Sequence, residues 1–153
     1  VFIMIKKLTL AAIALLLSMT TTLNHATEFG TEAQAKAMIE RAINLVNIDK
    51  VRALDAFTDL DGGFGYKDLY VFCFNKKGIL LAHPKNLGAD ASGLMDEDGL
   101  NIWSLVSSTQ KGEIKKITYK LVRPTTDSEE VYTKTSFITK VKGMYCGVGF
   151  YEG

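Results

Sequence analysis

The sequence predicts an α+β domain in which two helices come before an antiparallel sheet. Three observations support this fold class. Apolar residues recur at helical spacing between residues 32 and 57, five later segments have the composition or the alternation of strands, and hairpins join most of these segments. Helices followed by hairpin-connected strands are typical of α+β domains, so we expect the first helix to cover one face of the sheet.

The two helices are predicted from capping residues and from a break in the apolar stripe. Thr31 and Gln34 have the spacing of a capping box, and apolar residues then recur on one face, which predicts a helix from about Glu32 to Asn47. Asp49 falls where the stripe requires an apolar residue. A second, short helix is therefore expected from about Lys50 to Phe57.

The strands begin after a glycine-rich loop at residues 59–65. Leu69–Phe74 has no polar side on either face, as in a central strand, and a turn at residues 75–78 leads into a second strand that ends at His83-Pro84. A helix is expected within residues 101–109. Three more strands are expected, at residues 117–121, 131–141 and 144–151.

The first 26 residues have the order of a secretory signal peptide. Lys6 and Lys7 precede an apolar run, and a small and polar stretch then ends at Ala26. Residues 27–153 are expected to form one exported, periplasmic domain. This part carries 16 basic and 17 acidic side chains, so it offers no basic surface for nucleic acid.

The sequence lacks the common signatures of catalysis and of metal binding. It has no nucleophile elbow, phosphate-binding loop, dinucleotide fingerprint or zinc spacing, and the loop at residues 59–65 fails the EF-hand pattern. Outside the predicted signal peptide, His83 is the only histidine. We therefore expect no enzymatic activity, no cofactor and no metal site.

A binding pocket for a small anion is better supported, because it requires apolar walls and a few fixed donors. His83 lies at a strand end, and Lys134 and Ser136 share one face of a later strand. The charges of the histidine and the lysine would favour a carboxylate. Each also has an ordinary alternative, such as a solvated lysine or a histidine bonded to its own loop. The aromatic residues expected around the pocket, or in the core, are Tyr70, Phe72, Phe74, Tyr119 and Trp103.

Cys73 and Cys146 are the two cysteines, and both lie in predicted strands. In an oxidising compartment they could form one disulfide, or each could be a small buried apolar residue. The sequence leaves both alternatives open.

Several segments together resemble the second type of single Cache domain. They are "ATEFGTEAQAKAMIERAI", "DKVRALDAF", "GGF", "DLYVFCFNKKGILLAHP", "KTSFITKV" and "CGVGFY", in this order. The resemblance implies a PAS-like five-stranded antiparallel sheet with a long N-terminal helix, in the strand order 2-1-5-4-3. In that order the strand of Cys73 lies beside the strand of Cys146.

The resemblance also implies a function. Cache domains are extracytoplasmic sensors of chemoreceptors and sensor kinases, and type-two members are associated with acetate, propionate and pyruvate. His83, Lys134 and Ser136 match the family's binding pattern, whereas Phe137 replaces a common tyrosine. No second apolar segment is long enough to span a membrane, so a separate membrane receptor or sensor kinase is the expected partner. The alternative is a ligand-free accessory subunit of such a receptor, with possible homodimerisation through the N-terminal helix.

Overall fold

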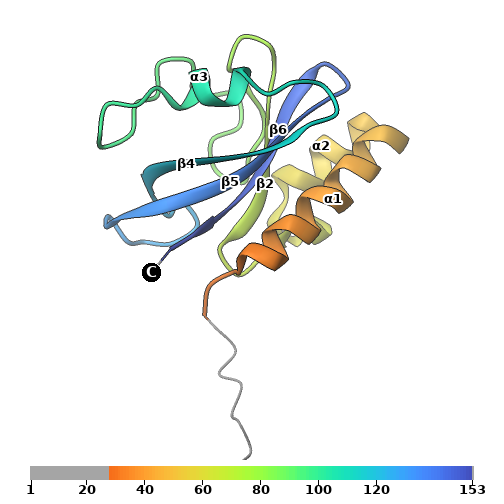
Figure 1. Cartoon of the computed structure of the whole chain (residues 1–153). Helices are drawn as coiled ribbons and strands as arrows, with labels where there is room; N and C mark the ends of the chain where they lie inside the picture. Colours follow the sequence, from red (N-terminus) through yellow and green to blue (C-terminus); the bar gives the residue numbers. More distant parts are fainter. Residues whose placement is uncertain (1–27, 153) are drawn as a thin grey trace, which may run out of the picture.

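The computed structural model describes residues 28–152, so the predicted signal peptide lies outside the described part of the chain. Two layers are visible in Figure 1, a curved antiparallel sheet and a helical layer that covers one of its faces. The helical elements are α1 (Glu32–Ile48), α2 (Lys50–Thr58), the π-type turn η1 (Leu60–Phe64) and α3 (Ile102–Ser107). The strands are β1 (Gly65–Tyr66), β2 (Leu69–Phe74), β3 (Leu80–Ala82), β4 (Ile114–Val122), β5 (Val131–Val141) and β6 (Met144–Tyr151).

The strand order confirms the predicted α+β sheet. In the described part of the chain the order is β1-β2-β6-β5-β4, and β3 pairs with β2 on the same edge as β1. All strand pairs are antiparallel. The five predicted strands lie in the expected order 2-1-5-4-3. The two-residue strand β1 was not predicted, because its sequence is part of the glycine-rich loop.

The helix boundaries follow from the capping residues seen in the sequence. The Thr31 hydroxyl accepts the Gln34 backbone N–H, and the Gln34 side chain accepts the Thr31 N–H, which completes the predicted capping box. Asp49 ends α1 and caps α2 by accepting the Arg52 N–H, so the break in the apolar stripe is a real helix boundary. The buried face of α1 consists of Ala35, Met38, Ile39, Ala42 and Val46.

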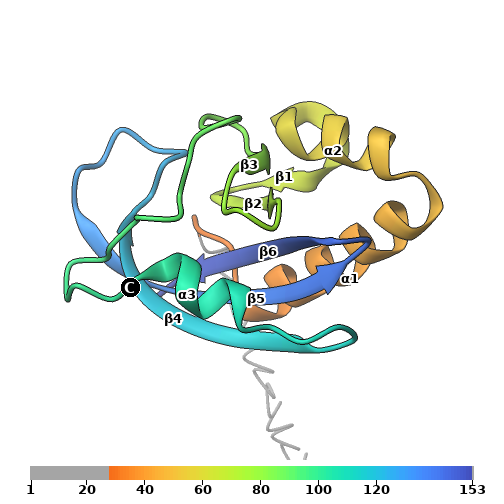
Figure 2. The same cartoon turned by 90° about the horizontal axis from the view of Figure 1, so that it is seen from above.

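Strand β2 is buried on both faces, as its sequence predicted. Leu69, Val71 and Cys73 pack in the core between the sheet and helices α1 and α2. Tyr70, Phe72 and Phe74 belong to a second core, with α3 and part of β4. Figure 2 shows α3 and the long connection before it on the opposite side of the sheet from α1.

A disulfide joins Cys73 to Cys146. The two residues are direct partners of β2 and β6, with their Cα atoms 4.0 Å apart. The crosslink therefore lies in the helix-side core and ties together two central strands that are distant in sequence.

The helices of residues 28–152 lack the length and apolar character needed to cross a bilayer.

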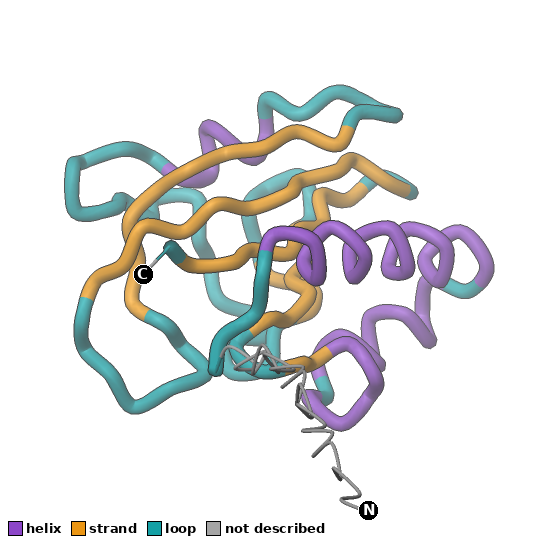
Figure 3. The backbone as a smooth tube through the Cα atoms, turned by 60° about the horizontal axis from the view of Figure 1, so that its bottom comes forward, coloured by secondary structure: helices purple, strands orange, loops and turns teal. Residues whose placement is uncertain are grey.

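Long loops lie at the end of the sheet that is farthest from the C-terminus of α1 (Figure 3). These loops matter for function because they close the cavity described next.

Candidate functional site

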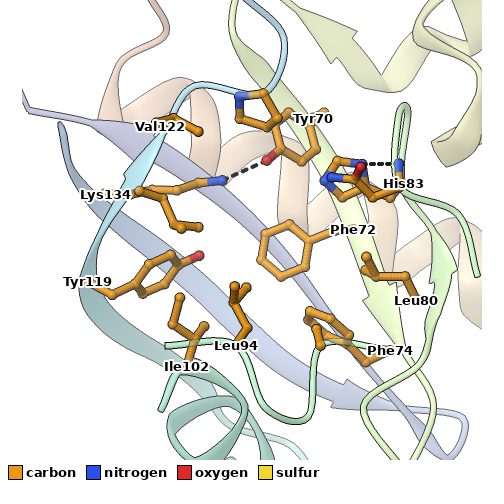
Figure 4. A pocket seen from close by; sticks show the side chains of 14 residues that line it. Tyr70, Phe72, Phe74, Leu80, His83, Leu94, Ile102, Tyr119, Val122 and Lys134 are labelled. Carbon is orange, nitrogen blue, oxygen red and sulfur yellow. Dashed lines mark hydrogen bonds between the residues drawn. The ribbon is translucent and has the colours of Figure 1, made fainter. Parts of the chain in front are cut away.

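A cavity of about 210 Å³ lies on the face of the sheet that α1 and α2 leave uncovered. Strands β2, β4 and β5 form its floor, and the connection between β3 and α3 covers it (Figure 4). Its walls are mainly aromatic and aliphatic. The lining residues are Tyr70, Phe72, Phe74, Leu80, His83, Asn86, Ala91, Leu94, Ile102, Tyr119, Leu121, Val122, Pro124 and Lys134.

Lys134 is a buried basic side chain on β5, with only 1% of its surface exposed. Its Nζ atom donates to the Tyr70 hydroxyl over 2.9 Å, as Figure 4 shows. Nζ also lies 4.6, 5.4 and 5.0 Å from the ring centroids of Tyr70, Phe72 and Tyr151. Burial lowers the pKa of Lys134 from 10.5 to about 7, and the Asp68 carboxylate opposes this shift.

His83 follows β3 and is fixed by its own turn. Its Nδ1 atom accepts the backbone N–H groups of Lys85 and Asn86, at 3.0 and 3.1 Å. A ring nitrogen that accepts cannot carry a proton, so the proton of the neutral imidazole is assigned to Nε2. Burial and, secondarily, the charge of Lys134 lower the pKa of His83 to about 4. The expected charge on His83 is therefore wrong at neutral pH, although Nε2–H remains a donor.

Tyr119 and Ser136 form a second polar pair near the lysine. Their hydroxyl oxygens are 2.8 Å apart, and both side chains are buried. Burial raises the pKa of Tyr119 to about 12, so the phenol stays neutral. Tyr119 lines the cavity, but Ser136 does not. Ser136 is therefore placed to hold Tyr119 rather than to contact a ligand directly.

The structure places Trp103 outside the cavity lining. Its ring packs against Phe74 and Tyr145, with centroids 5.6 and 5.5 Å away, while its neighbour Ile102 lines the cavity instead. Adjacent helix positions point about 100° apart. The predicted helix was therefore right, but the residue expected at the rim was not.

Sequence reasoning missed several lining residues, most of them aliphatic. Leu94, Pro124 and Asn86 lie in irregular connections, where no periodic pattern indicates which side chains point inward. Leu121 and Val122 come from the end of β4. Leu80, Leu94, Ile102 and Val122 thus lie among the polar groups of the lining, with Val122 beside Lys134 and Ile102 beside Tyr119 (Figure 4).

A buried ion pair lies beside the cavity and was not predicted. Arg123 Nε is 3.2 Å from Asp68 Oδ2, and both side chains are at most 3% exposed. The guanidinium carbon lies 3.9 and 3.8 Å from the ring centroids of Phe29 and Tyr132. The other oxygen of Asp68 accepts the Gly30 N–H at 2.7 Å. These contacts fix the segment before α1 against the end of β4.

The site is suited to binding rather than to nucleophilic catalysis. Its serine is bonded to a tyrosine instead of the histidine, and the imidazole accepts two backbone amides. Within residues 28–152, no group of three or more metal-ligating side chains comes together. A buried ammonium, two tyrosine hydroxyls and one imidazole N–H beside apolar walls are the features expected of a pocket for a small organic anion.

The fold is that of Cache-type sensor domains. A methyl-accepting chemotaxis protein from Vibrio parahaemolyticus is similar in structure, with a TM-score of 0.63, 19% identity and coverage of 78% of this chain and 86% of that one. The periplasmic sensor domain of a chemotaxis protein gives a TM-score of 0.57 and 21% identity, covering 77% and 88%.

A third similar structure is a Cache chemosensory domain described as recognising carboxylic acids. It gives a TM-score of 0.55 and 20% identity, and the match covers 79% of this chain and 88% of that one. No family model and no curated protein matches the chain. The expected Cache-like fold is thus confirmed at the level of structure.

Proposed function

We propose that this protein is a periplasmic sensing domain that binds a short monocarboxylic acid non-covalently. The observation that carries the proposal is the buried amino group of Lys134, because among residues 28–152 it is the only lysine or arginine in the lining and no acidic residue lines the cavity. A buried charge is stable only when it is paired. An incoming carboxylate would supply the missing counter-charge.

The proposed ligand has one anionic end and an apolar remainder. Its carboxylate would accept hydrogen bonds from Lys134 and from the hydroxyl of Tyr70 or Nε2–H of His83. Each charge-assisted bond is worth about 1.5–3 kcal/mol. The remainder would contact aliphatic lining residues such as Leu80 and Ile102. A second carboxylate would find no second lysine or arginine among the described lining residues, so dicarboxylates should bind more weakly.

The size of the cavity supports a small ligand. Its 210 Å³ corresponds to the liquid volume of about seven water molecules. The acetate, propionate and pyruvate class fits within this limit. One of the similar structures is described as recognising carboxylic acids, which supports the same ligand class. The open cavity favours this function over a ligand-free accessory subunit.

We further propose that residues 1–26 act as a signal peptide and that a separate membrane receptor or sensor kinase receives the signal. Two of the similar structures belong to chemotaxis proteins, which supports this context. Homodimerisation through α1 stays a prediction. The buried face of α1 already packs on the sheet, and its other positions are mainly polar.

The test is thermal unfolding of the protein with a panel of two- to four-carbon monocarboxylates and dicarboxylates. A ligand at a hundred times its Kd should stabilise the fold by about 2.7 kcal/mol. Lys134→Met should remove this stabilisation while the protein stays folded. The matched control is Lys36→Met, on the exposed side of α1, which should respond as the unmodified protein does. The proposal fails if no monocarboxylate stabilises the protein, or if Lys134→Met responds equally.

A further inference from the structure

The two ends of the sheet carry opposite charge. One end, called the basic end here, surrounds a groove of about 690 Å³ between α1, the α3–β4 turn and the β5–β6 turn. Lys50 reaches the same place, because its Nζ atom lies 3.4 Å from the Lys142 carbonyl oxygen. The lysines of the basic end are Lys50, Lys76, Lys111, Lys140 and Lys142.

In the part of the chain that the structure describes, the lysines of the basic end have no acidic partners. No acidic residue of this part lines the groove, and none of its ion pairs involves these five side chains. Asp49 and Glu113 are the nearest acids in sequence. Their carboxylates accept the backbone N–H groups of Arg52 and Gln110, respectively. The positive charge at this end is therefore only partly balanced.

The other end, called the acidic end, is built from two loops. Residues 95–97 and the strand ends at 121–122 and 131 line one shallow pocket, so the loop before α3 adjoins the loop between β4 and β5. Lys120 pairs with Asp98 and offsets one charge. The acidic side chains of these loops are Asp96, Glu97, Asp98, Asp127, Glu129 and Glu130.

Strand register holds the two ends apart. Ile114 pairs with Thr139 at the basic end, and Val122 pairs with Val131 at the acidic end. A nine-residue strand spans about 26 Å, so each cluster lies beyond a Debye length of the other at physiological salt. Figures 1 and 3 show the two turns of the basic end beside the C-terminus of α1 and the two acidic loops at the opposite end. The nearly neutral total charge conceals this separation.

Both ends also expose apolar side chains of the kind found in interfaces. Ile48 and Val51, on either side of Lys50, are 83% and 72% exposed. Met95, beside the acidic cluster, is 54% exposed. Each end thus combines an exposed apolar group with charge that complements the other end.

We propose that copies of this protein associate head to tail, with the basic end of one copy against the acidic end of the next. The two contacting surfaces differ, so the contact is heterologous and generates an open chain or a ring instead of a closed two-fold dimer. Exposed charges drive the contact, so it is weak and sensitive to salt. A dimer through α1 would instead be two-fold and largely insensitive to charge at the strand ends.

The first measurement is sedimentation velocity of the purified full chain over a range of concentrations. At an ionic strength of about 0.01 M, where the Debye length is about 30 Å, the weight-average mass should rise with concentration and exceed that of a dimer. At about 1 M salt it should return to that of the monomer. A monomer at every concentration and salt would overturn the proposal.

The decisive measurement mixes two variants, in each of which the charge of one end is largely neutralised. Lys111→Glu/Lys142→Glu removes the basic end, and Glu97→Lys/Glu129→Lys removes the acidic end. Each variant alone should associate at least about tenfold more weakly. An equimolar mixture should form heterodimers and nothing larger at moderate concentration, because each variant keeps one functional end. Circular dichroism verifies that both variants are folded.

A control and two opposing outcomes complete the test. Lys36→Glu/Lys85→Glu changes the net charge equally but lies outside the basic end, so association should persist. A dimer that survives in both of these variants would overturn the proposal and indicate an α1 interface. A monomer whose basic end binds poly-L-glutamate would overturn it too, and would indicate an acidic partner of another kind.

Discussion

Replacing Lys134 with methionine should raise stability near neutral pH even though it removes the proposed ligand contact. Methionine nearly preserves the length and volume of the side chain but carries no charge. The fall in pKa of Lys134 from 10.5 to about 7 corresponds to a destabilisation of the buried ammonium by at most about 5 kcal/mol. The substitution also removes a hydrogen bond from the buried Tyr70 hydroxyl, which costs about 1–3 kcal/mol. A net gain of at most about 2–4 kcal/mol is expected at about pH 6.

The pH dependence of this gain has a definite sign. The unfolded chain binds the lysine proton up to about pH 10.5, and the folded protein only up to about pH 7. The penalty is therefore complete below pH 7, decreases as the pH rises, and is absent above 10.5. The stability advantage of Lys134→Met should fall by about 3 kcal/mol between pH 6 and pH 9.

Urea denaturation of both proteins at about pH 6 and about pH 9 measures this difference directly. The m-value should stay the same, because the substitution leaves the buried surface almost unchanged. Lys36→Met, at an exposed position, should show no pH-dependent difference. An equal loss of stability at both pH values for Lys134→Met would show that the ammonium is a structural requirement, and the reasoning would then be refuted.

Three further predictions concern the scaffold. Replacing Cys73 and Cys146 together by alanine removes the crosslink between residues that are 73 positions apart in sequence. The free energy of unfolding should fall by about 4 kcal/mol in the chain-entropy model, measured by denaturation with and without reductant. Gly149→Ala places a Cβ atom against the lysine and serine side chains of β5 and should lower both stability, by about 1–3 kcal/mol, and carboxylate binding. As a control, the Cβ atom of Gly93→Ala has no described atom within 4 Å, so this substitution should change neither stability nor carboxylate binding. Asp68→Ala leaves a buried guanidinium unpaired and should cost about 3–5 kcal/mol in urea denaturation; a loss below 1 kcal/mol would mean that water reaches the arginine.

Much of the fold could be predicted from the sequence because regular elements leave a periodic pattern. The double burial of β2 was visible as a run without polar residues, and the break at Asp49 marked the boundary between α1 and α2. The short strand β1 could not be predicted, since a pairing of two residues depends on the neighbouring strand and not on any local alternation. Only the pairing of β1 with β2 in the folded structure defines it as a strand.

In the candidate site, too, residues on regular strands could be predicted, whereas residues in irregular connections could not. Lys134 and Tyr70 were found because they occupy regular strands, whose alternation fixes the face of each side chain. The charge of His83 was predicted wrongly because its pKa depends on the burial of the ring and on the nearby Lys134, neither of which the local sequence reveals. Leu94 escaped notice because it lies in an irregular connection.

The turn after β4 connects the cavity to the segment that precedes α1. Val122 and Pro124 touch the cavity, and the arginine between them holds Phe29 just ahead of the first helix. If a bound ligand displaces this arginine, reciprocity requires that a displacement of the arginine from the N-terminal side changes the affinity of the cavity by the same factor. A force on the N-terminal side of the domain and a ligand in the cavity would then act on the same three residues, 122–124.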